Sequence, residues 1–268
     1  MDLNLILEKV IEITKESAKF TKGDFTTTEK GSHVNFVTSA DIAVQKFLEE
    51  KLVELLPNSA FFGEENTKSV SEAEYLWIVD PIDGTVNFSR GISETAISVG
   101  LVHKEKPILG VIYMPDKNEL YHAILGGGAF LNGKKINVSD RDFKNSLFCT
   151  AFSLYNKGYA EMCIDIMREV YHDSVDVRRS GSCAMDICYL ARGSCELFFE
   201  FRVFPWDYCA GIVILNEAGG IITDLSGKDI KLDRPCPAIA ANNKENHQKL
   251  LEIVRKHIGT LPYEEILR

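Results

Sequence analysis

The sequence predicts a protein of mixed α and β structure, with an antiparallel sheet in its N-terminal half and a mixed sheet in its C-terminal half. In the first half, Thr95 to His103, Ile108 to Tyr113 and Glu119 to Ile124 are apolar segments separated by short turns, which is typical of an antiparallel meander. Beyond residue 146, segments with strand and helix patterns alternate, as they do in α/β proteins.

The length of the chain allows one large domain or two closely packed ones, because it has 268 residues. The composition changes near Ser139 to Asn145, after the meander and before the α/β alternation. We therefore predict an N-terminal domain of residues 1–141 and a C-terminal domain of residues 142–268.

The overall composition is that of a soluble globular protein, with 45% hydrophobic and 26% charged residues. A net charge of −9 argues against a nucleic-acid partner bound through a basic face. The seven cysteines include no Cys-x-x-Cys pair, which argues against a zinc ribbon and favours reduced thiols in the cytoplasm. The first 20 residues do not form a signal peptide, and no apolar segment approaches the length of a membrane span.

The N-terminal elements follow from hydrophobic spacing. A first helix is predicted from apolar residues at helical intervals, namely Leu3, Ile6, Leu7, Val10 and Ile13. Phe20 to Ser32 is polar and indicates a loop or hairpin. The segment Thr38-Ser39-Ala40-Asp41 is the polar start of a second helix, which ends at Pro57. The simplest explanation of Asp41 is that it is an acidic residue in the first turn, which the helix dipole favours. A short strand, Ala60-Phe61-Phe62, then leads into Gly63-Glu64-Glu65.

The segment with the strongest chemical pattern runs from Tyr75 to Phe88. Its first part is an apolar strand, after which Asp80 and Asp83 would direct two carboxylates at one point. Gly84 allows the backbone to approach a ligand, and a helical turn beginning at Gly84-Thr85 would offer N–H groups to an anion. Oxygen ligands beside anion donors suggest metal-assisted phosphate chemistry. Taken alone, however, Asp-x-x-Asp is more often a strand followed by an Asx-rich turn.

The C-terminal half is predicted as alternating elements: strand Ser146 to Ala151, helix Tyr159 to Val170, strand Ser174 to Arg178, helix Cys183 to Leu190, strand Glu196 to Phe199, helix Asp207 to Ala218, strand Gly220 to Thr223, strand Ala238 to Ala240 and helix Glu245 to His257.

The sequence Pro205-Trp206-Asp207 at a helix start has two explanations. Asp207 is either an N-cap or a functional carboxylate.

Taken together, these motifs resemble the inositol monophosphatase family over most of the chain. The resemblance rests on Gly63-Glu64-Glu65, on Trp77-Ile78-Val79-Asp80-Pro81-Ile82-Asp83-Gly84-Thr85, on Trp206-Asp207 with Ala210-Gly211, and on Glu217-Ala218-Gly219-Gly220. It implies a layered αβαβα fold and a magnesium-dependent, lithium-sensitive phosphomonoesterase site between the two halves. It also implies two to three Mg²⁺ ions in each site and a homodimer.

The resemblance also implies roles for individual residues. Glu64, Asp80 and the Ile82 carbonyl would hold one cation. Asp80, Asp83 and Asp207 would hold a second. A third ion would lie near Glu64 through water. Thr85 and Asp41 would orient the attacking water, which Glu64 helps to activate. The substrate would contact Asp83, the N–H groups of Gly84 and Thr85, Cys183 and Glu200.

The substrate implied by the resemblance is a small phosphorylated polyol or sugar, with myo-inositol 1-phosphate first because Thr85-Val86-Asn87-Phe88 looks like the inositol branch. Fructose-1,6-bisphosphatase activity, alone or in addition, is the main alternative. A third hypothesis is that the chain is a non-catalytic protein of this fold that binds metal or phosphate. The chain departs from the family at Asn35, where relatives often have aspartate, and at Cys183, where a small residue is common. Lys30 falls where a family lysine comes near the site.

Overall fold

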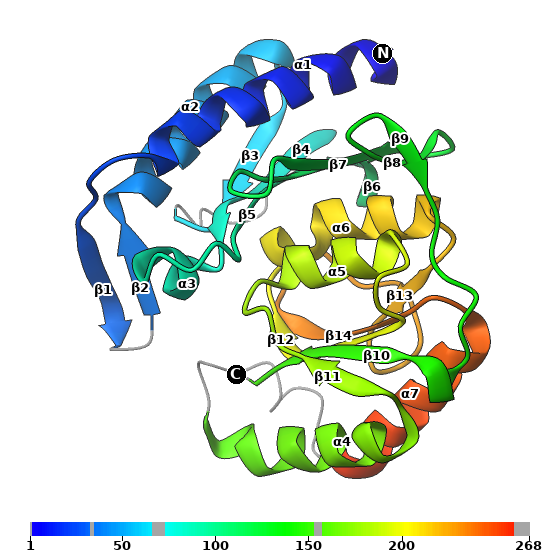
Figure 1. The fold of residues 1–268 in the computed structure, drawn as a ribbon. Coiled ribbons are helices and arrows are strands. Elements are labelled where there is room, and N and C mark those ends of the chain that lie inside the picture. The colour runs from blue at the N-terminus through cyan, green and yellow to red at the C-terminus, as the bar shows by residue number, and fades with distance from the viewer. Residues whose placement is uncertain (1, 33–34, 66–72, 153–156, 260–268) are drawn as a thin grey trace.

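The structure, a computed structural model, describes residues 2–32, 35–65, 73–152 and 157–259. Layers of helices and sheets are stacked in Figure 1, in the order helices, sheet, helices, second sheet and helices. The helices are α1 (Leu3–Ser17) and α2 (Ser39–Leu55) outside the first sheet, α5 (Cys183–Ala191) and α6 (Pro205–Glu217) between the sheets, and α4 (Ala160–Asp173) and α7 (Lys244–Ile258) outside the second. This arrangement confirms the predicted αβαβα fold.

The first sheet has the order β3-β4-β5-β6-β7-β8-β9. Its strands are β3 (Ala60–Gly63), β4 (Tyr75–Asp83), β5 (Ala96–His103), β6 (Lys106–Met114), β7 (Glu119–Ile124), β8 (Gly128–Leu131) and β9 (Lys134–Ile136). All neighbours from β4 onward are antiparallel, and β3 pairs parallel with β4. The antiparallel meander predicted from short turns is therefore confirmed.

The second sheet is mixed, with the order β11-β10-β12-β14-β13. Its strands are β10 (Leu147–Ala151), β11 (Asp176–Arg178), β12 (Leu197–Val203), β13 (Ile221–Thr223) and β14 (Cys236–Ala241). Strand β10 pairs parallel with β11 and β12, whereas β14 is antiparallel to β12 and β13. Residues 137–146 connect the first sheet to the second, and they include a 3₁₀ turn at Phe143–Asn145. The division into domains at residue 141 stays a prediction.

Two further strands pair antiparallel, β1 (Thr27–Ser32) and β2 (Asn35–Thr38). Strand β1 lies within Phe20 to Ser32, where a loop or hairpin was predicted, whereas β2 follows that segment and was not predicted as a strand. The short helix α3 (Thr85–Ser89) lies beside β2. Two further 3₁₀ turns cover Ala18–Thr21 and Lys157–Tyr159. The side chains of Lys30 and Asn35 lie outside the described part of the structure.

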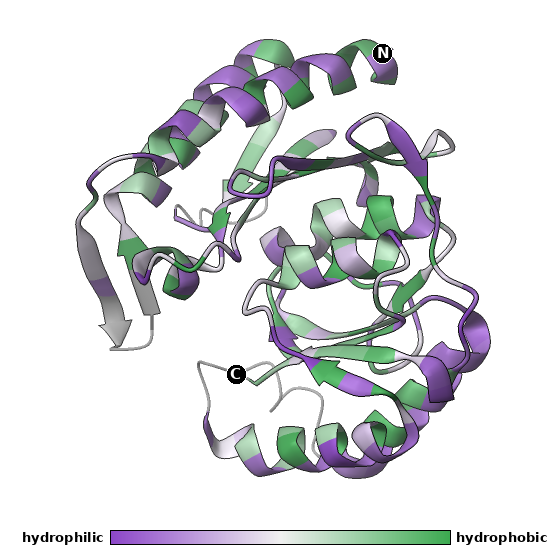
Figure 2. Ribbon diagram, in the orientation of Figure 1, coloured by the Kyte–Doolittle hydropathy of each residue, from purple (hydrophilic) through white to green (hydrophobic). Residues whose placement is uncertain are grey.

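Helix α6 joins the two halves because it packs directly on the backbone of the first sheet. A Cβ atom on Gly110 would lie 2.2 Å from the carbonyl oxygen of Ala210, and one on Gly100 would lie 2.6 Å from Cys209 Sγ. Only glycine therefore allows this approach. The hydrophobic colour along α5 and α6 in Figure 2 fits their position between two sheets. Cys209 is fully buried there as a small apolar side chain.

All seven cysteines are free and buried. Among the helices in the described ranges, none combines the length and the apolar character that crossing a membrane requires.

Candidate active site

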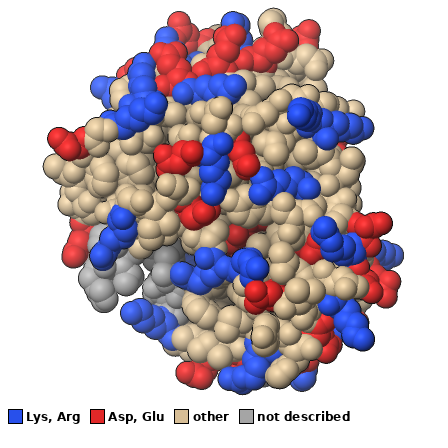
Figure 3. Space-filling view, in the orientation of Figure 1, with Lys and Arg blue, Asp and Glu red and all other residues tan. Residues whose placement is uncertain are grey.

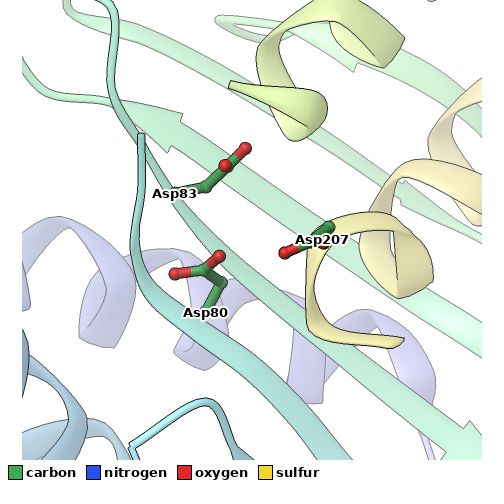
Figure 4. A group of neighbouring side chains, drawn as sticks. All are labelled: Asp80, Asp83 and Asp207. Atoms are coloured by element: carbon green, nitrogen blue, oxygen red, sulfur yellow. The ribbon is translucent and has the colours of Figure 1, made fainter. Parts of the chain in front are cut away.

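Three aspartates from two elements surround one space. Asp80 and Asp83 lie at the end of β4, and Asp207 lies in the first turn of α6 (Figure 4). One carboxylate oxygen of each lies within 4.8 Å of the others. The pairing of β4 with β5 is irregular between Asp80 and Asp83, at the Pro81 corner. Because Pro81 lacks an N–H to pair, the strand bends there and both carboxylates reach the same space.

The carboxylate of Asp83 is fixed by the N-terminus of α5. Its Oδ2 accepts hydrogen bonds from Ser182 Oγ and from the Ala184 N–H, both at 2.6 Å. Ser182 is also the N-cap of α5, because its hydroxyl accepts from the Met185 N–H. With Oδ2 occupied by two donors, Asp83 can present its other oxygen to a cation.

Asp207 is not the N-cap of its helix, so the N-cap explanation of Pro205-Trp206-Asp207 is wrong, although its side chain still takes part in a capping box from the third helical position. Helix α6 begins at Pro205, two residues before the predicted start, because proline suits the first helical position. Phe204 occupies the N-cap position, and Asp207 Oδ2 accepts its N–H at 2.7 Å. The backbone bond holds this carboxylate in place beside the aspartates of β4.

Asp41 and Thr85 meet at the edge of the same site. Asp41 is buried in the first turn of α2, where its Oδ2 accepts from the Thr38 hydroxyl and, at 2.9 Å, from the Thr38 N–H. Its Oδ1 lies 3.4 Å from Thr85 Oγ1, which is also 3.1 Å from the Ile82 carbonyl oxygen. The Thr85 hydroxyl has one proton, so when it donates to one of these oxygens its lone pairs can accept from a third group.

One cavity brings together the remaining predicted site residues. Its wall includes Glu64, Ile82, Gly84, Cys183 and Glu200, together with the three aspartates and Thr85. Gly84 has a φ of +92°, a conformation that glycine adopts without strain, and it forms the N-cap of α3. Burial raises the pKa of the Cys183 thiol well above its usual value, so this side chain is a neutral part of the wall.

The carboxylates have abnormal pKa values because they share a buried space. Burial raises the pKa of Asp80 well above its usual value, and the charges of Glu64 and Asp83 raise it further. The pKa of Asp83 rises to about 6, since burial outweighs the hydrogen bonds from Ser182 and Ala184. Burial, followed by the charge of Asp83, also raises the pKa of Asp207. A divalent cation would relieve this repulsion, and carboxylate and carbonyl oxygens are the ligands that Mg²⁺ prefers.

Several residues at the site were not predicted from the sequence. Ser182 preceded a predicted helix, which indicates an N-cap, but no local signal indicated that it also binds Asp83. Arg179 and Arg202 also line the cavity, and sequence patterns alone do not distinguish them from solvated arginines. These contacts depend on how the two sheets and α5 are packed together.

In the metal-free protein, stability should fall as pH rises. Unfolded aspartate has a pKa of about 3.9, so raised folded pKa values mean that the folded state binds more protons between that pH and the folded pKa. These groups stabilise the fold fully below about pH 4, and for Asp83 the contribution is lost as pH rises through about 6. We expect a lower melting temperature in EDTA at about pH 7.5 than at about pH 5.

Magnesium ions should reverse this trend. Protons and cations compete for the same oxygens, so added Mg²⁺ should raise the melting temperature more at the higher pH. The measurement is a thermal melt at both pH values, with and without Mg²⁺. A melting temperature in EDTA that rises over this pH interval would contradict the interpretation.

Comparisons with known proteins agree with this geometry. The sequence profile of the inositol monophosphatase family matches residues 2–259. The chain is 33% identical over 262 residues to the fructose-1,6-bisphosphatase/inositol-1-monophosphatase of Aquifex aeolicus, covering 94% of this chain and 97% of that protein. It is 35% identical over 201 residues to the Nus factor SuhB of Escherichia coli K12, covering 74% of this chain and 75% of that protein.

Solved structures show the same fold. The inositol monophosphatase of Thermotoga maritima superposes with a TM-score of 0.85 at 28% identity, covering 97% of this chain and 99% of that one. An inositol monophosphatase/NADP phosphatase, solved with Mg²⁺ and phosphate, superposes with a TM-score of 0.81 at 26% identity, covering 93% of each chain.

Proposed function

This chain belongs to the inositol monophosphatase family and is a phosphoric monoester hydrolase, and we propose that it hydrolyses myo-inositol 1-phosphate to inositol and phosphate in a Mg²⁺-dependent reaction. The observation that carries this proposal is the convergence of Asp80, Asp83 and Asp207 on one space inside the cavity. The relative solved with Mg²⁺ and phosphate supports the choice of cation and reaction.

We propose that the cation ligands are divided between the two halves of the chain. Glu64, Asp80 and the Ile82 carbonyl would hold one ion, and Asp80, Asp83 and Asp207 a second. A third ion would lie near Glu64. Bound Mg²⁺ would supply Lewis-acid stabilisation for the charge that develops on the phosphoryl and leaving oxygens.

The protein's own groups would prepare the attack by water. Thr85 would donate its hydroxyl proton to Asp41, so that Oγ1 accepts a hydrogen bond from the water and orients it, and Glu64 would help to activate the water as a proton acceptor. The N–H groups of Gly84 and Thr85 would bind the phosphate, with Asp83 beside it. Glu200 and Cys183 would contact the polyol, because both line the cavity on the side of the C-terminal half.

The proposal is tested by phosphate release from myo-inositol 1-phosphate at saturating Mg²⁺, with the same reaction in EDTA as the control. We expect turnover that depends on the metal and that added Li⁺ inhibits. Tight Mg²⁺ binding without turnover of any phosphomonoester would instead support a non-catalytic binding protein.

Fructose-1,6-bisphosphatase activity is a second candidate. Two observations favour it: the Aquifex aeolicus relative is named for both activities, and two arginines line the cavity. The assay should therefore compare inositol 1-phosphate with fructose 1,6-bisphosphate directly. Comparable rates would indicate a dual-activity enzyme.

The expected partners are small molecules and a second copy of the chain. Acidic and basic side chains are interspersed on the face drawn in Figure 3, and the net charge is −9, which supports our expectation that the protein does not bind nucleic acid through a basic face. The homodimer is proposed from family membership. The seven free cysteines support a cytoplasmic location.

A further inference from the structure

The side chain of Asn87 bonds to both halves of the protein beside the cavity. Asn87 lies in α3, and its Nδ2 atom donates to the carbonyl oxygens of Glu94 and Ser180, both at 2.8 Å. Glu94 belongs to the connection from α3 to β5 in the N-terminal half, and Ser180 to the turn between β11 and α5 in the C-terminal half. Because both partners are carbonyl groups, the amide nitrogen must face them, and its two hydrogens match the two acceptors.

The backbone of Asn87 is itself held in place. Its carbonyl oxygen accepts hydrogen bonds from the N–H groups of Arg90 and Ile92, both at 3.0 Å. The amide therefore projects from a fixed turn that lies two residues after Thr85. A side chain that binds two segments from a fixed base limits how far those segments can move apart.

The turn that Asn87 binds carries the group that holds Asp83. Ser182 Oγ donates to Asp83 Oδ2 at 2.6 Å. Within the turn, Ser180 Oγ donates to the Ser182 carbonyl at 3.0 Å and accepts from the Ser182 N–H at 3.1 Å, so these residues move as a unit. Gly181 between them has a φ of +84°, and a Cβ atom there would lie 3.0 Å from Asn87 Nδ2. Glycine therefore allows the turn to approach the amide closely.

Gly84 is enclosed by the same groups. A Cβ atom on Gly84 would lie 2.8 Å from the carbonyl oxygen of Glu94, which is also the acceptor for Asn87, and 3.5 Å from the carbonyl oxygen of Gly181. Gly84 lines the cavity, and its N–H is proposed to bind the phosphate. The position of this N–H relative to Asp83 therefore depends on contacts that the Asn87 amide holds together.

We propose that Asn87 is a positioning residue for the reaction. It holds residues 180–182 against α3, so that Asp83 and the Gly84 N–H keep the separation that phosphate binding requires. This inference rests on the proposed function, because Asn87 acts through groups that are proposed to contact the cation and the phosphate. The alternative is that Asn87 only stabilises the fold. The two roles differ in their effect on the folded protein, because a displacement of about 1 Å in a catalytic group can reduce turnover by roughly 10²-fold.

The test replaces Asn87 with leucine, which has the same branching and the same number of side-chain heavy atoms but no donor. The variant and the wild type are compared at a temperature at which thermal melts show both to be folded. We expect kcat/KM for inositol 1-phosphate to fall by roughly 10- to 100-fold. The inhibition constant of inorganic phosphate, the product, should rise by about tenfold, because a hydrogen bond to a charged group contributes at least that much to affinity.

The matched control is Asn242→Leu. The Nδ2 atom of Asn242 also donates to two carbonyl groups, those of Arg141 at 2.8 Å and Ser139 at 3.1 Å, and the residue is buried outside the cavity wall. This variant should lose stability but keep the wild-type kcat/KM and the wild-type inhibition constant. Asn87→Ala removes the same two donors as the leucine variant, should show the same kinetic losses, and replaces it in the test if leucine prevents folding.

Three results would overturn the inference. The first is a wild-type kcat/KM in the folded Asn87 variants, which would leave Asn87 with a role in stability alone. The second is an equal kinetic loss in Asn242→Leu. The third is a loss of kcat/KM without a change in the inhibition constant of phosphate, which would place the effect away from the phosphate.

Failure of the proposed function can be separated from failure of this inference. If the wild type releases no phosphate from any monoester, the proposed function fails. Calorimetric binding of inorganic phosphate with Mg²⁺ present then tests the role of Asn87. Weaker binding in Asn87→Leu but not in Asn242→Leu supports it. Equal binding by the three proteins, or no binding by the wild type, refutes it.

Discussion

Replacing Asp80 with asparagine is expected to lower kcat by roughly 10³-fold or more, because metal stabilisation of the transition state contributes several kcal/mol and each tenfold in rate corresponds to about 1.4 kcal/mol. Asp80 is 1% exposed and lies between Glu64, Asp83 and Asp207, whose charges all raise its pKa. We propose that it bridges two cations, so its loss would weaken both. The measurement is phosphate release from inositol 1-phosphate over a range of Mg²⁺ concentrations.

The same variant should fold at least as stably as the wild type in EDTA. Asparagine has nearly the same shape as aspartate but carries no charge, so the repulsion around it is reduced. A melting temperature equal to or above that of the wild type would show that lost turnover is not a folding defect. The matched control is Asp229→Asn, an exposed aspartate outside the cavity. Retention of turnover by Asp80→Asn would refute the metal mechanism.

Replacing Thr85 with valine is expected to lower kcat by roughly 10²-fold, the typical contribution of a group that positions a proton transfer. Valine keeps the volume and branching of threonine but removes the hydroxyl that lies between Asp41 and the Ile82 carbonyl. The loss should appear in kcat more than in KM, since the hydroxyl is proposed to act on water and not on the polyol. Steady-state kinetics with inositol 1-phosphate measure both.

The control for Thr85 is serine, which retains the hydroxyl and should recover most of the turnover. Asp41→Asn should resemble the valine variant, because Asp41 is proposed to orient the same hydroxyl. If Thr85→Val turned over substrate at the wild-type rate, Thr85 would have no part in orienting the water.

Much of the fold could be predicted because its signals are local. Strands β5, β6 and β7 are apolar segments separated by short turns, and such turns leave neighbouring strands few alternatives to antiparallel pairing. Helix starts were less certain. Asp207 had the pattern of an N-cap, but Pro205 moves the beginning of α6 and leaves Asp207 at the third position. An error of two residues in the start of the helix therefore changes which backbone group the Asp207 carboxylate binds.

Part of the candidate site could be predicted from the sequence. The spacing of Asp80, Pro81 and Asp83 suggested two carboxylates directed at one point, and they do lie together. Spacing alone could not add Asp207, which follows more than a hundred residues later. It was the resemblance to a family that joined Asp207 to the others and also suggested Asp41 and Thr85 as a pair.

By itself, the sequence determined most of the elements of this protein, although not strands β2, β8 and β9, and the chemical character of its site, because periodicity, turns and residue type act over a few neighbouring residues. Only the tertiary structure decided which groups meet. Helix α6 reaches the first sheet because Gly100 and Gly110 have no side chains. The N-terminus of α5 then holds Asp83, and Arg179 and Arg202 share a cavity with it. Such contacts depend on how whole layers pack, and a local pattern carries no information about the layer it will face.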